Sequence, residues 1–153
     1  RDMGGMRLFT GTFTHALDAK NRVSVPRKML DVLRQSESGG AEVALTVGFE
    51  PCLYLYPPEE FARLGEAITS GSLGDEMVRD LGRTWFGQAE VCPVDKNGRM
   101  LVPDGLKSQI GLEDKVVFVA AGTRVELWTP AAHEERLAAS LARYKDQARE
   151  VLK

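Results

Sequence analysis

The chain has 153 residues, 43% of them hydrophobic and 27% charged, so it is long enough to bury a core without disulfides or metal. Its formal net charge of −2 argues against a generic basic nucleic-acid binder, although a local basic patch is compatible with that value. The two cysteines, Cys52 and Cys92, and the two histidines, His15 and His133, are isolated from one another. We therefore expect buried apolar thiols, no metal site and no cofactor.

We expect the natural chain to begin at Met6, and the predicted elements follow from there. Alternating and β-branched residues predict strands over 8–17, 22–25, 41–47 and 52–56 in the first half. Apolar residues at helical spacing predict helices over 27–33, 58–68 and 74–86, the first with Pro26 in its first turn. The second half has predicted strands over 89–94, 99–102, 115–121 and 124–129, a short helix over 104–110 and a long helix from about Pro130.

One ten-residue pattern occurs twice, as LDAKNRVSVP at 17–26 and VDKNGRMLVP at 94–103. Aligning the aspartates places Arg22 on Arg99, and after a five-residue shift Tyr56 falls on Trp128. The flexible loop QSESGG at 35–40 absorbs that shift. The chain is therefore an internal repeat, each copy reading as strand, turn, strand, short helix and two strands.

The repeated pattern encodes a tight turn. An aspartate at the first position, Asp18 or Asp95, can accept hydrogen bonds from backbone N–H groups ahead of it. The residue before the arginine is Asn21 in one copy and Gly98 in the other, the two types that best tolerate positive φ. The arginine then starts the next strand, where it either pairs back with the aspartate or points outward.

Basic residues gather around the first copy of the turn, since residues 15–34 hold five Lys or Arg and two Asp. Lys20, Arg22, Arg27 and Lys28 could face one way on a hairpin and the adjoining helix start. Two strands can enter a DNA major groove, where arginine reads guanine and lysine holds phosphate. The alternative is an exposed Asp–Arg pair that only fixes the turn. The second copy offers Lys96 and Arg99 with fewer basic neighbours, so a smaller effect is expected there.

The segments GTFTHALDAKNRVSVPRKMLDVL (11–33) and GQAEVCPVDKNGRMLVPDGLKSQIGL (87–112) closely resemble the paired D-x-x-x-R repeats of the MraZ family. The resemblance covers residues 9–129 and departs from the family pattern at Asn21, where glycine is usual. It implies a mainly β, α+β fold in which two SpoVT/AbrB-like units form a pseudo-twofold double-split β-barrel within one chain.

The resemblance also implies a function. It is that of a DNA-binding transcriptional regulator of the division and cell-wall gene cluster, which binds direct repeats upstream of its own operon as a ring-shaped homo-oligomer on the nucleoid. The carried-over DNA-contacting arginines are Arg22 and Arg99, fixed by Asp18 and Asp95.

The expected domain limits are 12–59 and 89–132 for the two repeats, 60–88 for a helical connector and 133–153 for the C-terminal helix. That last helix carries an apolar stripe that either packs on its own barrel or joins protomers: Leu137, Leu141, Tyr144, Ala148 and Val151. Trp85 and Phe86, and the matched pair Tyr56 and Trp128, are expected to be packing residues, and His15 to lie on a surface or edge strand.

Two other function classes are less consistent with the sequence. A protein-interaction module of antitoxin type would use the same barrel, but such proteins usually end in a disordered tail and this chain ends in a predicted helix. An enzyme is not expected, because no nucleophile elbow, P-loop, zinc-protease or Cys/His pattern occurs. No apolar run spans a bilayer and no signal peptide opens the chain, so we expect a soluble cytoplasmic protein without membrane contact.

Overall fold

The structure is a computed structural model that describes residues 7–153, so the expected start at Met6 lies outside the described residues. The strands are β1 (Thr12–Ala16), β2 (Arg22–Ser24), β3 (Glu42–Val47), β4 (Leu53–Tyr56), β5 (Glu90–Pro93), β6 (Arg99–Leu101), β7 (Lys115–Ala120) and β8 (Val125–Trp128). The helices are α1 (Arg27–Arg34), α2 (Pro58–Thr69), α3 (Glu76–Trp85), α4 (Asp104–Ile110) and α5 (Pro130–Val151). Every predicted element is present, and each repeat has the predicted order of elements.

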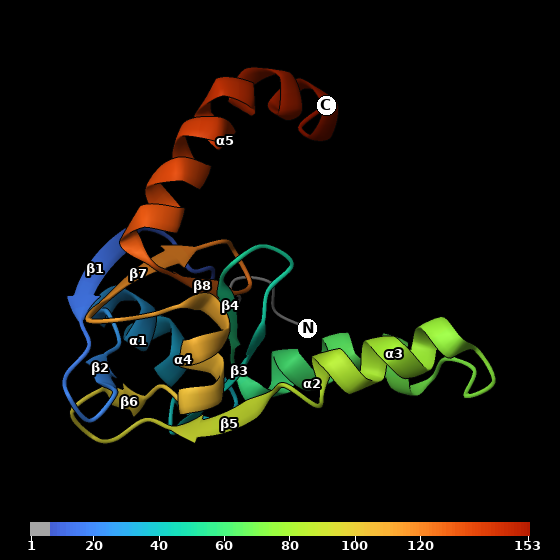
Figure 1. Ribbon diagram of the computed structural model, residues 1–153, viewed down its shortest axis with the longest axis horizontal. Helices are drawn as coiled ribbons and strands as arrows, with labels where there is room; N and C mark the ends of the chain where they lie inside the picture. The colour runs from blue at the N-terminus through green and yellow to red at the C-terminus, as the bar shows by residue number, and fades with distance from the viewer. Residues whose placement is uncertain (1–6) are drawn as a thin grey trace.

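The strands of the two repeats are interleaved (Figure 1). One antiparallel sheet has the order β1-β7-β8-β4-β3-β5, and a separate two-stranded ribbon pairs β2 with β6. Exchanging each strand with its counterpart in the other repeat reproduces the same order read backwards. The two repeats are therefore related by a pseudo-twofold exchange of strands, and neither completes a sheet alone.

The pairing register obeys the same exchange. His15 pairs with Val116, the second residue of β7, and the counterpart of His15, Cys92, pairs with Val43, the second residue of β3. At the centre of the ribbon Val23 pairs with Met100, its own counterpart. The ladders among residues 7–153 leave the sheet open at β1 and β5, so closure into a double-split barrel stays a prediction.

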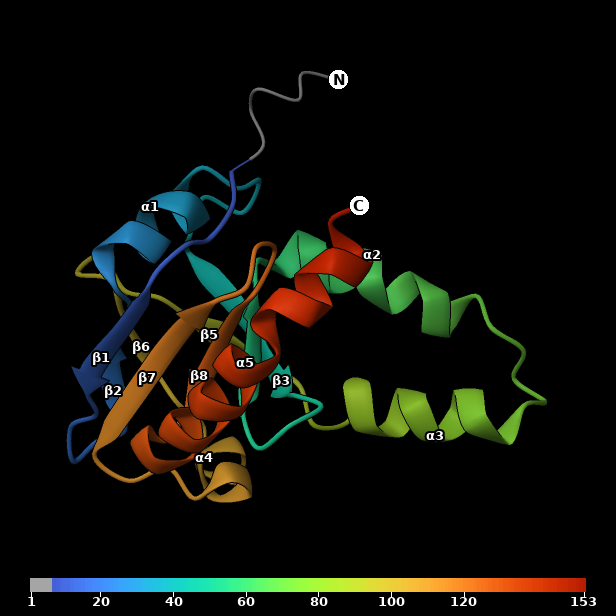
Figure 2. The same cartoon turned by 90° about the horizontal axis from the view of Figure 1, so that it is seen from above.

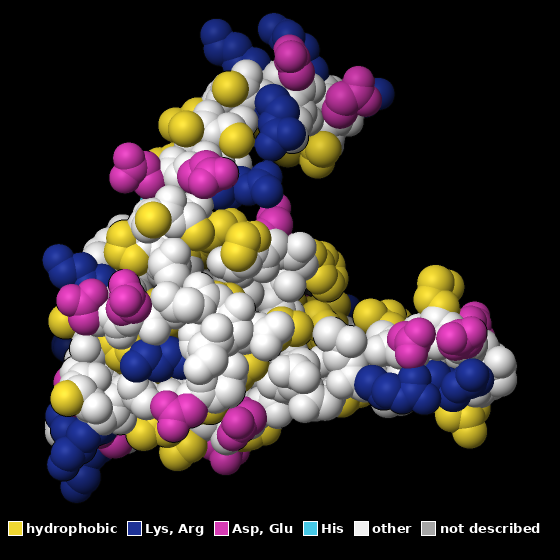
Figure 3. Space-filling model, viewed as in Figure 1, with side chains coloured by type: hydrophobic (Ala, Val, Ile, Leu, Met, Phe, Trp, Pro, Cys, Tyr) yellow, Lys and Arg dark blue, Asp and Glu magenta, His cyan; other side chains and the backbone are white. Residues whose placement is uncertain are grey.

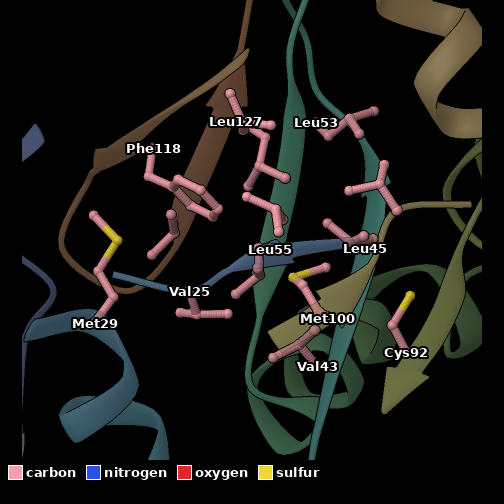
Figure 4. Close-up of a cluster of buried hydrophobic side chains, with 14 of the residues drawn as sticks. Val25, Met29, Val43, Leu45, Leu53, Leu55, Cys92, Met100, Phe118 and Leu127 are labelled. Carbon is pink, nitrogen blue, oxygen red and sulfur yellow. The ribbon is translucent and has the colours of Figure 1, made fainter. Parts of the chain in front are cut away.

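The inner face of the sheet forms the main core with the ribbon and the two short helices (Figure 4). Leu53 and Leu55 of β4 and Leu127 of β8 point to this side, against Met100 of β6 and Met29 of α1. Because alternate residues of a strand face opposite sides, the aromatic residues between these leucines point the other way. The sheet is therefore buried on both faces at its centre.

A second cluster covers the outer face of the sheet, where α2, α3 and the start of α5 pack. Tyr56 and Trp128, matched by the repeat, are both buried there, and Trp85 stacks on Phe61 with ring centroids 5.5 Å apart. The prediction that Tyr56, Trp85 and Trp128 serve packing is confirmed. Phe86 is partly exposed and meets Phe61 edge-on.

Two helical arms leave the compact β body. The α2–α3 hairpin extends to one side, and α5 rises from the end of β8 (Figures 1 and 2). No residue of α5 is buried, and four members of the apolar stripe are exposed: Leu137, Leu141, Tyr144 and Val151. Within residues 7–153 the stripe therefore does not pack on its own sheet, which removes the first of its two expected roles.

Candidate nucleic-acid interface

The first D-x-x-x-R turn is fixed by its aspartate. The Oδ1 atom of Asp18 accepts hydrogen bonds from the backbone N–H groups of Lys20 at 2.8 Å and Arg22 at 2.9 Å. The backbone N–H of Asn21 donates to the Asp18 carbonyl at 3.0 Å. Asn21 has φ +62°, which is the left-handed conformation that the sequence predicts at this position.

The second turn repeats this geometry. Asp95 Oδ1 accepts from the N–H groups of Asn97 and Arg99, both at 2.9 Å, and Gly98 has φ +80°. Each turn closes only a short hairpin: Asp18 N–H donates to the Arg22 carbonyl and Asp95 N–H to the Arg99 carbonyl, both at 2.9 Å, and Val94 and Met100 form an antiparallel bridge. Beyond these contacts β1 and β5 join the large sheet, while β2 and β6 pair with each other.

Each arginine pairs back with its aspartate and is also exposed. The Nε atom of Arg22 donates to Asp18 Oδ2 at 3.0 Å, and that of Arg99 to Asp95 Oδ2 at 3.3 Å. The two arginine side chains keep 40% and 41% of their surface accessible. Because the pairing uses Nε, the Nη groups have no partner within residues 7–153, so the aspartate orients the guanidinium and leaves its outer edge available.

Both aspartates are held in the ionised form. The backbone N–H of Arg22 is the largest influence that lowers the pKa of Asp18, and the backbone N–H of Arg99 does the same for the pKa of Asp95. A hydrogen bond that favours the carboxylate lowers a pKa in this way. In each turn, therefore, an ionised aspartate holds the arginine four residues later in a fixed orientation.

The ribbon places the two arginines on one surface. Arg22 lies opposite Leu101, and Ser24 lies opposite Arg99. Val23 and Met100, between them, point into the core, so the four other side chains form the outer face of the ribbon. With strands ~4.8 Å apart and a rise of ~3.3 Å per residue, the Cα atoms of the two arginines are roughly 8 Å apart.

This outer face carries side chains of types that can contact the edges of DNA bases. Arginine can bond the O6 and N7 atoms of guanine, serine can bond several bases, and an apolar side chain can contact the methyl group of thymine. Leu101, which is 49% exposed, also lies on this face, although the turn motif alone does not single it out. The signal was available, because Leu101 aligns with Ser24 and alternates with the core residue Met100.

The other predicted basic residues lie at the two ends of the ribbon. Lys20 lies in the first turn and Lys96 in the second, and both are exposed. Arg27 and Lys28 begin α1, beyond the far end of β2 from the first turn, so the structure does not gather them around Arg22. Lys and Arg side chains are prominent at the corner of the molecule where the turns project (Figure 3).

His15 contacts the ribbon from the neighbouring edge of the large sheet. It lies on β1 at an edge of the large sheet, as predicted, and its Nδ1 atom lies 2.6 Å from the Ser24 carbonyl oxygen. Its ring meets Phe118 edge-on with centroids 5.8 Å apart. His15 therefore ties the sheet edge to the back of the ribbon.

Other kinds of site are not found in the part of the chain that the structure describes. Residues 7–153 contain no group of three His, Cys, Asp or Glu side chains that could hold a metal ion. Cys52 and Cys92 are both buried and unpaired by disulfides, as predicted. None of the described helices is long and apolar enough to cross a membrane.

Comparison with known proteins agrees with this architecture. The family model described as "MraZ protein, putative antitoxin-like" matches the chain twice in tandem, over residues 8–84 and 85–153. A protein of Thermomicrobium roseum named transcriptional regulator MraZ is 36% identical over 86% of this chain and 91% of its own length. Proteins of the same name from Kocuria rhizophila and Bifidobacterium longum are 34% and 36% identical over 95% of this chain, and over 97% and 93% of theirs. The chain therefore belongs to the MraZ family.

Proposed function

We propose that this chain is a sequence-specific DNA-binding transcriptional regulator that reads DNA with the outer face of the β2–β6 ribbon. The observation that carries the proposal is the pair of aspartate-oriented arginines, Arg22 and Arg99, on one exposed face. A two-stranded ribbon fits the major groove, and a positioned arginine is its commonest reader of guanine. The name transcriptional regulator, carried by relatives that match nearly the whole chain, supports the same role.

The finer parts of the proposal concern target and assembly. The target is a set of direct repeats upstream of the protein's own operon, within the division and cell-wall gene cluster, and the site of action is the cytoplasm at the nucleoid. The chain acts as a ring of identical protomers, for which the exposed apolar stripe of α5 supplies a contact surface. Repeated contacts along one DNA would compensate for the low net charge of each protomer, because linked binding raises overall affinity by about 10²–10⁴. The double-split barrel is the arrangement that we propose for the interleaved sheet and ribbon.

Binding to the DNA upstream of the gene tests the proposal. Fluorescence anisotropy over a salt series compares that DNA with a scrambled duplex of equal length. We expect tight, salt-sensitive binding to the upstream DNA only. Equal and weak binding to both duplexes would show that the turns serve the fold alone.

Variants then test the assigned residues. Arg22→Ala should lose specific binding and Arg99→Ala should weaken it less, and both should keep the circular dichroism spectrum, because both side chains are partly exposed. Arg149→Ala on α5 is the matched control, since Arg149 also pairs with an aspartate but lies far along the chain from the ribbon. Normal specific binding by Arg22→Ala would remove that residue from the interface.

The second candidate is a protein-interaction module, which the antitoxin-like wording of the family description favours. Against it, α5 is a regular helix of 22 residues where antitoxins of this type usually carry a disordered tail. A stable partner protein recovered without DNA would support this role. A catalytic role is not proposed, because each turn aspartate already accepts from two backbone N–H groups and one arginine.

A further inference from the structure

The antiparallel ribbon brings each short helix next to the turn of the other repeat. β2 runs from the first turn to Pro26 and α1, while β6 runs from the second turn to Pro103 and α4. At one end of the ribbon Val25 N–H donates to the Gly98 carbonyl at 2.9 Å. At the other end Val102 N–H donates to the Asn21 carbonyl at 2.8 Å. The basic start of α1 therefore lies beside the second turn (Figure 2).

At the first turn the neighbouring helix contributes an acid. Asn21 Nδ2 donates to Asp104 Oδ1 at 2.7 Å, and Lys107 Nζ donates to Asn21 Oδ1 at 2.9 Å. These bonds place a carboxylate beside the turn that carries Arg22. A phosphate that approached this end of the ribbon would meet the exposed carboxylate of Asp104, whereas the positive charge of Lys107 is partly buried against Asn21.

At the second turn the same positions have different chemistry. The 77-residue offset of the repeat makes Arg27 the counterpart of Asp104 and Leu30 the counterpart of Lys107. A Cβ atom added to Gly98 would lie 2.6 Å from Leu30 Cδ2, so α1 packs closely against this turn. The Arg27 side chain is 82% exposed, with Asp31 as a distant partner at 3.8 Å. An exposed arginine, paired only at 3.8 Å with Asp31, therefore stands where the other end has a carboxylate.

We infer that Arg27 of the first repeat and Arg99 of the second form one cross-repeat site for the DNA backbone, and that this site fixes the direction in which the protein sits on DNA. This proposal rests on the proposed function, and Arg27 and Asp104 are the residues that make the two ends of the ribbon different. A perfectly twofold ribbon would bind equally well in either direction. The exchange of Arg27 for Asp104 breaks that equivalence, which suits a target made of direct repeats rather than a palindrome.

The experiment is a set of double-mutant cycles on the upstream DNA, measured as dissociation constants over a salt series. We expect Arg27→Ala to weaken binding severalfold and to reduce the salt slope by about one unit, the value for one lost phosphate contact. Arg34→Ala is the matched control, because Arg34 lies at the opposite end of α1 and should leave affinity unchanged. Asp104→Asn should strengthen binding, since it removes a negative charge from the other end.

The double-mutant cycles test whether Arg27 of the first repeat and Arg99 of the second act at one site. Arg27→Ala should be non-additive with Arg99→Ala and additive with Arg22→Ala, because the structure puts Arg27 beside the second turn. Coupling to Arg22 instead, or an effect of Arg27→Ala no larger than that of Arg34→Ala, would overturn the inference and leave the proposed function intact. If the wild-type protein does not distinguish upstream from scrambled DNA, the proposed function and the inference fail together.

Discussion

Gly98 packs so closely on Leu30 that an added Cβ atom would displace the leucine side chain, whereas Asn21, at the equivalent position of the first repeat, carries a side chain there. A Cβ atom on Gly98 would be 2.6 Å from Leu30 Cδ2, and Leu30 is buried. Asn21 is accommodated because the counterpart of Leu30 is Lys107, which it bonds. The departure of Asn21 from the glycine usual in the family thus has a partner 86 residues away in the chain.

We predict that Gly98→Ala lowers the free energy of unfolding by about 1–3 kcal/mol more than Gly111→Ala does. Both glycines have positive φ, +80° and +67°, so both substitutions carry the left-handed backbone cost. Only at Gly98 would the new methyl group overpack a buried side chain, since nothing lies within 4 Å of a Cβ on Gly111. Urea unfolding of the two variants gives the difference, and equal losses would contradict the contact with Leu30.

The turn aspartates should make stability depend on pH in the acid range. The folded-state pKa of Asp18 is lowered from 3.8, mainly by the N–H of Arg22, so its stabilisation is complete above that value and is lost as pH falls through the lower folded pKa. The stability difference between wild type and Asp18→Asn should therefore shrink as pH falls below about 4. Unfolding curves at a series of pH values measure it. Asp146→Asn on α5 serves as the exposed control, and a difference that stays constant with pH would refute the role of the ionised carboxylate.

The two cysteines of the folded protein should react slowly with alkylating reagents. Burial raises the pKa of Cys52 to about 12 and that of Cys92 to about 11, so almost no thiolate exists at neutral pH. We predict that iodoacetamide modifies the folded protein at least about 100-fold more slowly than free cysteine, and modifies both residues at once in urea. Mass spectrometry over time follows the reaction, and rapid single labelling of the folded chain would disprove the burial.

The outer face of the ribbon should not tolerate a negative charge. Leu101→Glu places a carboxylate opposite Arg22 and two residues from Arg99 on the same face, where it repels DNA phosphates and pairs with the arginines. We expect specific binding to fall by at least about tenfold, with stability nearly unchanged because Leu101 is about half exposed. Leu73→Glu, in the exposed connection between α2 and α3, is the control and should bind DNA normally. Unchanged binding by Leu101→Glu would mean that this face does not meet DNA.

Local sequence was enough to predict most elements of this fold and the conformation of its turns. All five helices lie within two residues of their predicted limits where these were given, and Pro26 precedes α1 as its N-cap rather than entering its first turn. The hairpins expected around the two aspartates extend only a short way past Arg22 and Arg99, because the strands then take other partners. A turn fixes the direction of the chain over five residues, but the partner of the next strand is chosen by burial of Val23 and Met100 against the shared core.

The sequence by itself determined the conformation of the two turns, because the bonds accepted by each turn aspartate join residues within four positions of each other: Asp18 to Arg22, and Asp95 to Arg99. It also determined the repeat, and with it the equivalence of the two halves. Only the tertiary structure decided that β2 pairs with β6, since the central pair of that ladder, Val23 and Met100, is 77 residues apart in the chain. Because of that pairing, Arg27 lies beside the second turn and not the first. It also puts Arg22 and Arg99 on one surface, because the alternation of side chains along a strand defines an outer face only once a core buries the other face.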